Sequence, residues 1–211
     1  MGEIIEEENS SVFYEAAKRV MDIVLSFIGL VLLSPILLLV SLFIKIDSKG
    51  PIFFKQKRIG INGTEFEMFK FRSMVVNAEE LKARLEEKNE MSGPMFKIAD
   101  DPRITKVGRF IRKTSIDELP QLWNVIKGDM SLVGPRPSLP KEVAQFEPWM
   151  RKRFEVKPGL TCFWQVGGRN NIDFEEWMKL DIKYVKERSL LLDAKLIFKT
   201  FFVLFGDENA H

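Results

Sequence analysis

The chain has 211 residues, of which 45% are hydrophobic and 29% charged, and its formal net charge is +2. This near-neutral balance argues against a nucleic-acid-binding module, so no nucleic-acid partner is expected. The chain has one cysteine, Cys162, and one histidine, His211, which excludes an internal disulfide framework and catalysis by histidine. An enzyme of this composition would use carboxylates, lysines, arginines, hydroxyls and a hard metal ion bound through oxygen.

The first long feature is an apolar segment that runs from Val20 to Ile44. Residues 23–44 carry no charge, and a helix of this length can cross the roughly 30 Å hydrocarbon core of a bilayer. Ser34 and Pro35 lie in its middle. The proline removes a backbone hydrogen bond and is expected to kink or break the helix, and Ser34 can bond a carbonyl that is left free.

Basic residues flank this apolar segment on both sides, so the positive-inside rule fixes no orientation. A helix that enters the membrane, turns at Ser34-Pro35 and returns to the same face satisfies both observations. A kinked spanning helix and a buried core helix are the alternatives. The remaining segments have the composition of a soluble domain attached to one face of the membrane.

A β-hairpin is predicted next, from strands over residues 52–59 and 64–71 joined at Asn62-Gly63. Near its end, Lys70 and Arg72 are two residues apart and share one strand face. This arrangement suits phosphate or anionic headgroups, although solvated charges on an edge strand explain it equally well. A polar surface helix over residues 77–89 and a turn at residues 100–103 follow.

The segment 112–137 holds the main candidate site. Ser115 and Glu118 form a Ser-x-x-Glu capping box at a predicted helix start, and Gly128 can end that helix. Asp117 and Glu118 would then lie at the N–H-rich end of the helix, a place suited to anions. A capping box on an ordinary helix explains the same pattern. Arg112 precedes this pair of carboxylates in the sequence.

Two loops after this helix each present an arginine. Arg136 is held between Pro135 and Pro137, and a guanidinium on such a rigid loop loses less entropy when it binds phosphate. Arg169 lies in a glycine-rich segment, residues 165–171, whose backbone N–H groups could surround a nucleotide or phosphate. Ordinary connecting loops are the alternative for both.

Three further helices are expected in the C-terminal half. The first covers residues 141–154, where Pro148 limits it or starts another helix, and the second covers residues 173–185. The third, over residues 190–204, is strongly apolar with two lysines, so it can lie in the membrane interface with the lysines at the headgroups.

With these motifs in place, the chain resembles the bacterial sugar transferases, which are monotopic polyprenyl-phosphate phosphoglycosyl transferases. The resemblance extends from about Lys18 to Leu204. It rests on KRVMD, Ser34-Pro35, IDSKGPIFFKQKRIG, KFRSM, DPRITKVGRFIRKTSIDELPQLWNVIKGDMSLVGPRP and KPGLTCFWQVGGRNN. Cys162 stands where glycine is expected, and GGRNN varies the usual loop.

The resemblance implies a mostly helical α+β fold with a re-entrant, Ser-Pro-broken membrane helix, a small hairpin and amphipathic interfacial helices. The expected organisation is a tail over residues 1–17, a re-entrant helix over 18–47, a cytosolic catalytic domain over 48–205 and a tail over 206–211. The expected location is the bacterial inner membrane, with the catalytic domain on the cytosolic face and a homodimer possible.

The resemblance also implies a reaction that moves a hexose-1-phosphate from a UDP-sugar to undecaprenyl or another polyprenyl phosphate, with release of UMP. Asp117 would be the nucleophile that forms an aspartyl-phosphosugar intermediate, and Glu118 would bind Mg²⁺. Arg112, Arg136 and Arg169 would hold phosphates or the nucleotide, with Lys70 and Arg72 as further ligands. The reaction would be the first membrane step in assembling an exopolysaccharide, O-antigen or capsule.

Two alternatives remain open from the sequence. The transferred group can be an N-acetylated or diamino sugar phosphate rather than galactose or glucose phosphate. Alternatively, the chain is a non-catalytic membrane scaffold of a polysaccharide assembly complex, which would release no UMP from any donor.

Overall fold

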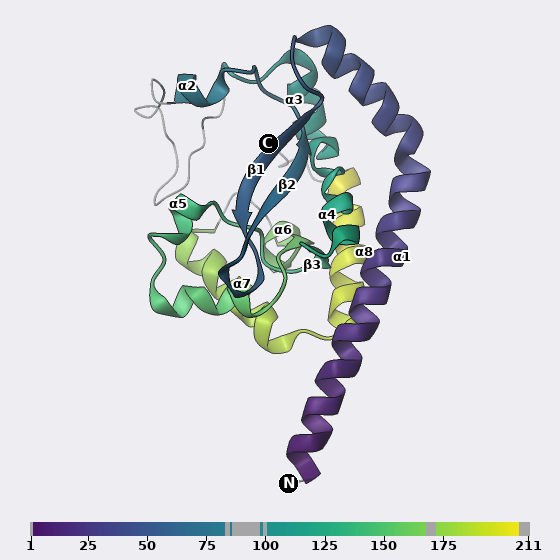
Figure 1. The fold of residues 1–211 in the computed structure, drawn as a ribbon, viewed down its shortest axis with the longest axis vertical. Helices are drawn as coiled ribbons and strands as arrows, with labels where there is room; N and C mark the ends of the chain where they lie inside the picture. The colour runs from purple at the N-terminus through teal and green to yellow at the C-terminus, as the bar shows by residue number, and fades with distance from the viewer. Residues whose placement is uncertain (1, 83–84, 86–97, 99–100, 168–171, 207–211) are drawn as a thin grey trace.

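The computed structural model describes residues 2–82, 85, 98, 101–167 and 172–206. It is mostly helical, with two small two-stranded sheets (Figure 1). The α-helices are α1 (Gly2–Asp47), α2 (Ala78–Lys82), α3 (Lys106–Lys113), α4 (Gln121–Lys127), α5 (Pro140–Val143), α6 (Phe163–Val166), α7 (Phe174–Glu187) and α8 (Leu190–Gly206). The 3-10 helices are η1 (Ile61–Gly63), η3 (Ile116–Glu118) and η4 (Pro148–Glu155), and the strands are β1 (Phe53–Ile59), β2 (Glu65–Phe71), β3 (Ser131–Val133) and β4 (Gly159–Thr161).

Helix α1 runs without interruption through Pro35 and bends in its second half (Figure 1). The prediction of a broken helix is therefore replaced by a continuous but curved one. Because Pro35 has no N–H, the carbonyl of Val31 loses its helical partner, and the Ser34 hydroxyl donates to that carbonyl at 2.8 Å. This bond confirms the expected role of Ser34. The helix also includes residues 2–17, which were expected to form a separate tail.

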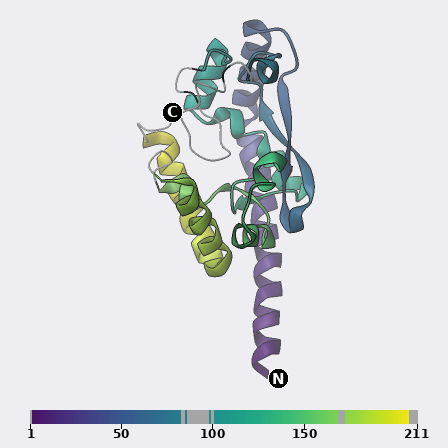
Figure 2. The same cartoon turned by 90° about the vertical axis from the view of Figure 1, so that its left-hand side faces the viewer.

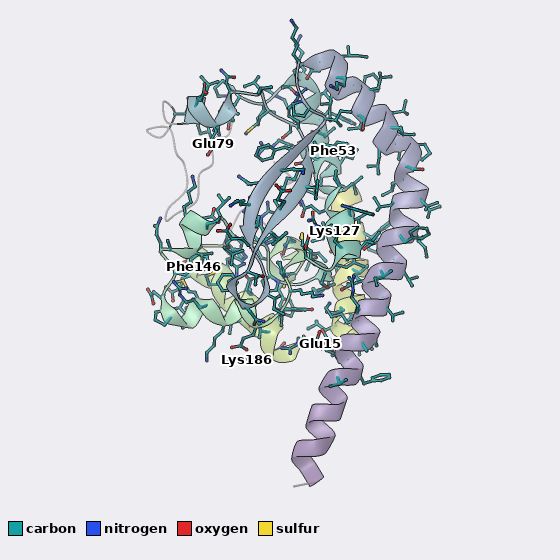
Figure 3. All side chains as sticks on the ribbon, viewed as in Figure 1. Glu15, Phe53, Glu79, Lys127, Phe146 and Lys186 are labelled. Carbon is teal, nitrogen blue, oxygen red and sulfur yellow. The ribbon has the colours of Figure 1, made fainter. Side chains whose placement is uncertain are left out.

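One face of α1 is strongly apolar and exposed. The segment Val12–Asp47 has a mean hydropathy of 2.9 over its most apolar window, and only 11% of that window is buried within the structure. Figure 3 shows side chains along the upper half of α1 projecting away from the rest of the molecule. The large exposed apolar residues of this half are Phe27, Ile28, Val31, Leu32, Ile36, Leu38, Leu39, Leu42, Phe43 and Ile46. A bilayer would cover such a face, so the exposed apolar residues support membrane association.

The predicted hairpin is confirmed. Strands β1 and β2 pair antiparallel from Phe53 opposite Phe71 to Ile59 opposite Glu65. Asn62 and Gly63 both have positive φ, 55° and 77°, which the Asn-Gly pair accommodates at little cost. Figure 2 shows the hairpin and α8 on opposite sides of the domain.

The second sheet is parallel and places two loops side by side. Ser131 of β3 lies opposite Gly159 of β4, and Val133 lies opposite Thr161. Gly134 and Gly159 allow the two segments to approach closely, because a Cβ on either would collide with the backbone of the other segment. This contact fixes where the Pro-Arg-Pro loop begins.

Both ends of the apolar segment of α1 are bonded to the same domain. At its start, Lys18 pairs with the buried Asp193 of α8 at 2.8 Å, and Asp22 accepts from the backbone of Leu132 at 3.0 Å. At its end, Asp47 accepts from the backbone N–H of Val107 in the first turn of α3 at 3.0 Å. Val40 and Ile44 join Phe71 and Ile111 in a buried cluster, so α1 forms part of the domain core.

The C-terminal half packs aromatic and aliphatic side chains around η4 and α7. Phe146, Met150, Trp177 and Met178 form one buried cluster, and Phe146 lies on the side of the molecule away from α1 (Figure 3). The predicted helix over residues 141–154 is divided into α5 and η4, and Pro148 starts the second of them, which confirms that this proline begins a new helical segment. Helices α7 and α8 match the expected ranges, and Asp173 caps α7 by accepting from the N–H of Glu176.

Candidate active site

The two adjacent carboxylates lie in η3, a single 3-10 turn between α3 and α4. The predicted capping box is wrong. Ser115 adopts a left-handed backbone conformation with φ of 54°, makes no side-chain capping bond, and α4 begins only at Gln121. The left-handed residue turns the chain sharply after α3, and this turn presents Asp117 and Glu118. Gly128 does end α4, with φ of 94°, as predicted.

Two cations from distant parts of the chain meet Glu118. Lys70 reaches it from β2, with 2.8 Å between its Nζ atom and Oε1, and Arg136 reaches it from the loop after β3, with 3.3 Å between Nη2 and the same Oε1. The Lys70 and Glu118 side chains are 16% and 24% exposed, so the pair is accessible from one side only. The structure thus brings together three of the predicted site residues.

Asp117 lies beside this group and is buried, with 8% of its surface exposed. Burial raises the pKa of its carboxyl to about 6. The positive charges of Lys70, Arg112 and Arg136 oppose that rise, whereas the neighbouring Glu118 adds to it. The carboxyl is therefore mostly ionised at neutral pH, and Arg112, exposed at the end of α3, belongs to the same electrostatic site.

A small pocket opens beside Glu118. Its walls include Lys70, Glu118 and Arg136, together with two residues that the sequence analysis did not select, Arg58 and Gln121. The remaining lining residues are Met68, Pro137, Gly159 and Leu160. Burial, followed by the nearby charge of Arg136, lowers the pKa of Arg58 to about 10. The pocket wall is rich in cations, which suits a polyanionic ligand.

Arg58 is one of several basic residues on the hairpin, and its position in the sequence does not single it out. It is one residue before the end of β1, on the strand that pairs with the one carrying Lys70. Its guanidinium donates to the carbonyl of Pro137 at 2.9 Å and to the side chain of Gln56 at 2.6 Å. Several basic residues lie on the hairpin, and only the folded structure shows that Arg58 is one that turns toward the pocket.

The other two predicted ligands are not placed at this site. Arg72 follows the end of β2 and points to the end of α1, where it donates to the carbonyl of Ser48 at 2.7 Å and to that of Lys49 at 3.0 Å. It closes the C-terminal end of the membrane helix. Arg169 lies outside the described residues.

The residues present fit a magnesium ion held jointly with a substrate. Mg²⁺ commonly binds through one or two carboxylates and substrate phosphates, and Glu118 offers a carboxylate at the pocket. Among the residues that the structure describes, no group of three or more acidic, histidine or cysteine side chains could form a protein-only site. An ion here would take its other ligands from substrate and water.

Comparison with known proteins places the chain in a family. A model of the bacterial sugar transferase family matches residues 13–207, so the chain belongs to that family. It is 50% identical over 185 residues to a galactosyl transferase, CpsE, of Streptococcus agalactiae, with 87% of this chain and 41% of the relative covered. It is also 43% identical over 199 residues to an undecaprenyl-phosphate galactose phosphotransferase of Salmonella typhimurium, with 92% and 41% covered.

A shorter relative matches over most of its length. The exopolysaccharide production protein ExoY of Sinorhizobium fredii is 39% identical over 188 residues, with 87% of this chain and 83% of the relative covered. The chain therefore spans 41% of the length of the two longer relatives and corresponds to most of the shorter one.

Proposed function

We propose that the chain is a phosphoglycosyl transferase that moves a hexose-1-phosphate from a UDP-sugar to undecaprenyl or another polyprenyl phosphate. The observation that carries the proposal is the carboxylate pair Asp117 and Glu118 beside a pocket lined by Lys70, Arg136 and Arg58. The printed name of the Salmonella relative supports a polyprenyl phosphate acceptor, and the names of both longer relatives support galactose as the first donor to test.

Asp117 is the nucleophile in this proposal. An ionised Oδ attacks the sugar-linked phosphorus of the donor, the new O–P bond forms, and the bond from that phosphorus to the oxygen of UMP breaks. UMP leaves with the electron pair. A phosphate oxygen of the lipid then attacks the same phosphorus, and the Asp117 carboxylate is released. Neither nucleophile carries a proton to be removed at neutral pH, so no histidine is required.

The cations of the pocket make the approach of the two anions feasible. Lys70 and Arg136 hold Glu118 in the absence of substrate and can transfer bonds to donor phosphates. Glu118 would hold Mg²⁺, which would neutralise charge on the transferred phosphoryl group. Arg112 at the rim and Arg169 in the glycine-rich segment are proposed to contact phosphate or nucleotide.

The membrane segment fits a lipid acceptor. We place the apolar stretch of α1 in the inner membrane as a re-entrant helix, with the catalytic domain on the cytosolic face. The contacts of Lys18 and Asp22 at one end, and of Asp47 at the other, support this topology because one domain holds both ends. The exposed aromatic residues Phe198, Phe201 and Phe202 support an interfacial position for α8.

The test is UMP release by the full chain in nanodiscs with UDP-galactose, undecaprenyl phosphate and Mg²⁺. Asp117→Asn keeps the shape of the side chain but removes the nucleophile, so UMP release is expected to fall below detection. Glu175→Gln is the matched control, because Glu175 pairs with Lys179 on the exposed face of α7 and the change is expected to leave turnover near wild type. Normal turnover by Asp117→Asn contradicts the covalent mechanism.

Two measurements separate the alternatives. Intact mass after mixing wild type with donor alone is expected to rise by one hexose phosphate, and not in Asp117→Asn. A panel that includes UDP-glucose and N-acetylated or diamino UDP-sugars identifies the donor by UMP release. Absence of UMP with every donor, together with assembly-partner binding that survives Asp117→Asn, indicates a scaffold instead.

A further inference from the structure

The loop that carries Arg136 is held almost entirely by groups outside itself. Its two prolines have no N–H, and its carbonyl oxygens accept bonds from three other segments. Pro135 accepts from the backbone of Gly159 at 2.9 Å, and Ser138 accepts from the backbone of Ile59 at 2.9 Å. Between them, the carbonyls of Arg136 and Pro137 accept from the guanidinium groups of two other arginines.

Arg153 of η4 is the more deeply buried of these two arginines. Its side chain is 1% exposed, and it donates to the carbonyl of Arg136 at 2.5 Å and to the hydroxyl of Ser138 at 2.6 Å. The guanidinium lies over the rings of Phe146 and Trp177, with 5.6 Å to each centroid. This aromatic enclosure leaves the guanidinium little freedom to move away from the loop.

Asp181 of α7 neutralises Arg153. The distance between Nη2 of Arg153 and Oδ2 of Asp181 is 2.7 Å, and the Asp181 side chain is fully buried. Burial raises the pKa of Asp181 to about 6, and the charge of Arg153 opposes that rise. The chain of contacts therefore runs from α7 through Arg153 to the backbone of the loop, and ends at the Arg136 side chain beside Glu118.

Trp164 steadies the Arg136 side chain from the other direction. The Arg136 guanidinium lies 5.8 Å from the centroid of Trp164, which stacks on Trp177 at 4.7 Å. Trp177 thus contacts both the ring beside Arg136 and the guanidinium of Arg153. The backbone and the side chain of Arg136 are supported by the same aromatic cluster.

A buried ion pair of this kind is a poor device for stability alone, because apolar residues of similar volume often replace such pairs without loss. We propose that Arg153 and Asp181 are a positioning pair, which holds the backbone of the Arg136 loop so that the Arg136 guanidinium stays at the reacting phosphates. The functional half of this inference rests on the proposed role of Arg136 in phosphoryl transfer. Neither member of the pair lines the pocket beside Glu118.

The experiment replaces the pair by apolar residues, Arg153→Met with Asp181→Leu, in the full chain in nanodiscs. The thermal midpoint is expected to stay close to wild type. Amide hydrogen exchange of the segment 134–138 is expected to accelerate by at least about tenfold, because the carbonyl of Arg136 and the hydroxyl of Ser138 lose their partner. UMP release should lose on the order of 100-fold in kcat/KM, mainly in kcat, as expected for a displaced catalytic group.

A double-mutant cycle with Arg136→Ala separates positioning from a general loss of structure. If the pair acts through Arg136, its replacement is expected to change kcat/KM less than about twofold when Arg136 is already alanine. The matched control is the other buried arginine–aspartate pair, Arg103→Met with Asp101→Leu, which lies near α2 and bonds the carbonyl of Ala78 rather than the loop. The effect of this control replacement on kcat/KM should add to the effect of Arg136→Ala.

Additive effects in the first cycle, or unchanged exchange of segment 134–138 in a folded double variant, overturn the proposal. If the apolar variant does not fold, Arg153→Lys keeps the charge opposite Asp181 but loses the forked contact to Arg136 and Ser138, and it is carried through the same cycle. If wild type releases no UMP from any donor, the proposed function fails, whereas the exchange measurement still decides whether the pair holds the loop.

Discussion

The protonation state of Asp117 depends on two opposing effects at one residue. Burial disfavours the charged carboxylate, and the cations around it restore much of the loss. The sequence analysis attributed the charged state to a helix N-terminus. The structure instead shows a 3-10 turn flanked by Lys70 and Arg136, so side-chain cations carry the effect.

This balance predicts how activity depends on pH. In the proposed mechanism, protonation of Asp117 removes the nucleophile, so kcat/KM is expected to fall as the pH decreases through about 6, the pKa of Asp117. Lys70→Met removes a charge that lowers this pKa, and the midpoint should therefore move to higher pH. UMP release measured from pH 5 to 8 tests both statements. Lys127→Met, which removes an exposed lysine paired with Asp129, should leave the midpoint in place, and a downward shift in Lys70→Met contradicts the assignment.

The positions of some single basic residues could not be predicted from a local sequence pattern. Lys70 and Arg72 are equivalent in a strand pattern, yet Lys70 lies on β2 and faces Glu118, whereas Arg72 follows the strand and bonds the end of α1. Arg58 was one of several basic residues on the hairpin, and only its contact with Pro137 brings it to the site. Residues that contact each other from such distant parts of the chain leave no local sequence pattern that would identify the contact.

At the scale of elements, local chemistry predicted the hairpin, Gly128 as the end of α4, and the approximate range of α7. These features depend on a few adjacent residues. The capping box failed because Ser115 takes a left-handed conformation that the same four-residue pattern does not reveal. The Pro-Arg-Pro loop was expected to be rigid because of its two prolines, whereas its contacts with Arg58 and Arg153 come from segments that the sequence does not connect to it.

The packing of α3 against the chain after β2 depends on one glycine. A Cβ on Gly108 would collide with the carbonyl oxygen of Ser73, whereas a Cβ on Gly29 would meet only the flexible end of Leu122 at 3.3 Å. Gly108→Ala is therefore expected to destabilise the fold by about 1–3 kcal/mol, as overpacked sites do. Gly29→Ala should be close to neutral. The thermal unfolding midpoints of Gly108→Ala and Gly29→Ala, measured in the same detergent, compare the two variants. Equal midpoints would refute the close contact between Gly108 and Ser73.

At the scale of the whole molecule, the apolar helix α1 is a structural part of the domain that carries the candidate site. Its buried residues Val40 and Ile44 complete one hydrophobic cluster, and Lys18 neutralises Asp193 of α8. The sequence analysis separated a membrane segment from a soluble domain. Composition alone could not show that polar residues at both ends of the apolar segment would form hydrogen bonds with the same domain.

This arrangement predicts that both ends of the apolar segment face the same compartment. Phe13→Cys and Lys49→Cys each place a thiol at an exposed position on either side of it. A membrane-impermeant maleimide added to intact bacterial spheroplasts is expected to label neither variant until the membrane is permeabilised. The unmodified chain is the control, because Cys162 is fully buried. Labelling of one variant before permeabilisation would establish a spanning helix.

The bond from Asp47 to the first turn of α3 connects the end of the apolar helix α1 to the segment that leads to the Asp117 carboxylate. Helix α1 ends at Asp47, α3 ends at Lys113, and only three residues separate that end from Asp117. A change in membrane thickness that tilts α1 would therefore be transmitted along a short path through α3 to Asp117, the proposed nucleophile. Lipid composition would then tune turnover through the shape of the enzyme, in addition to supplying its acceptor.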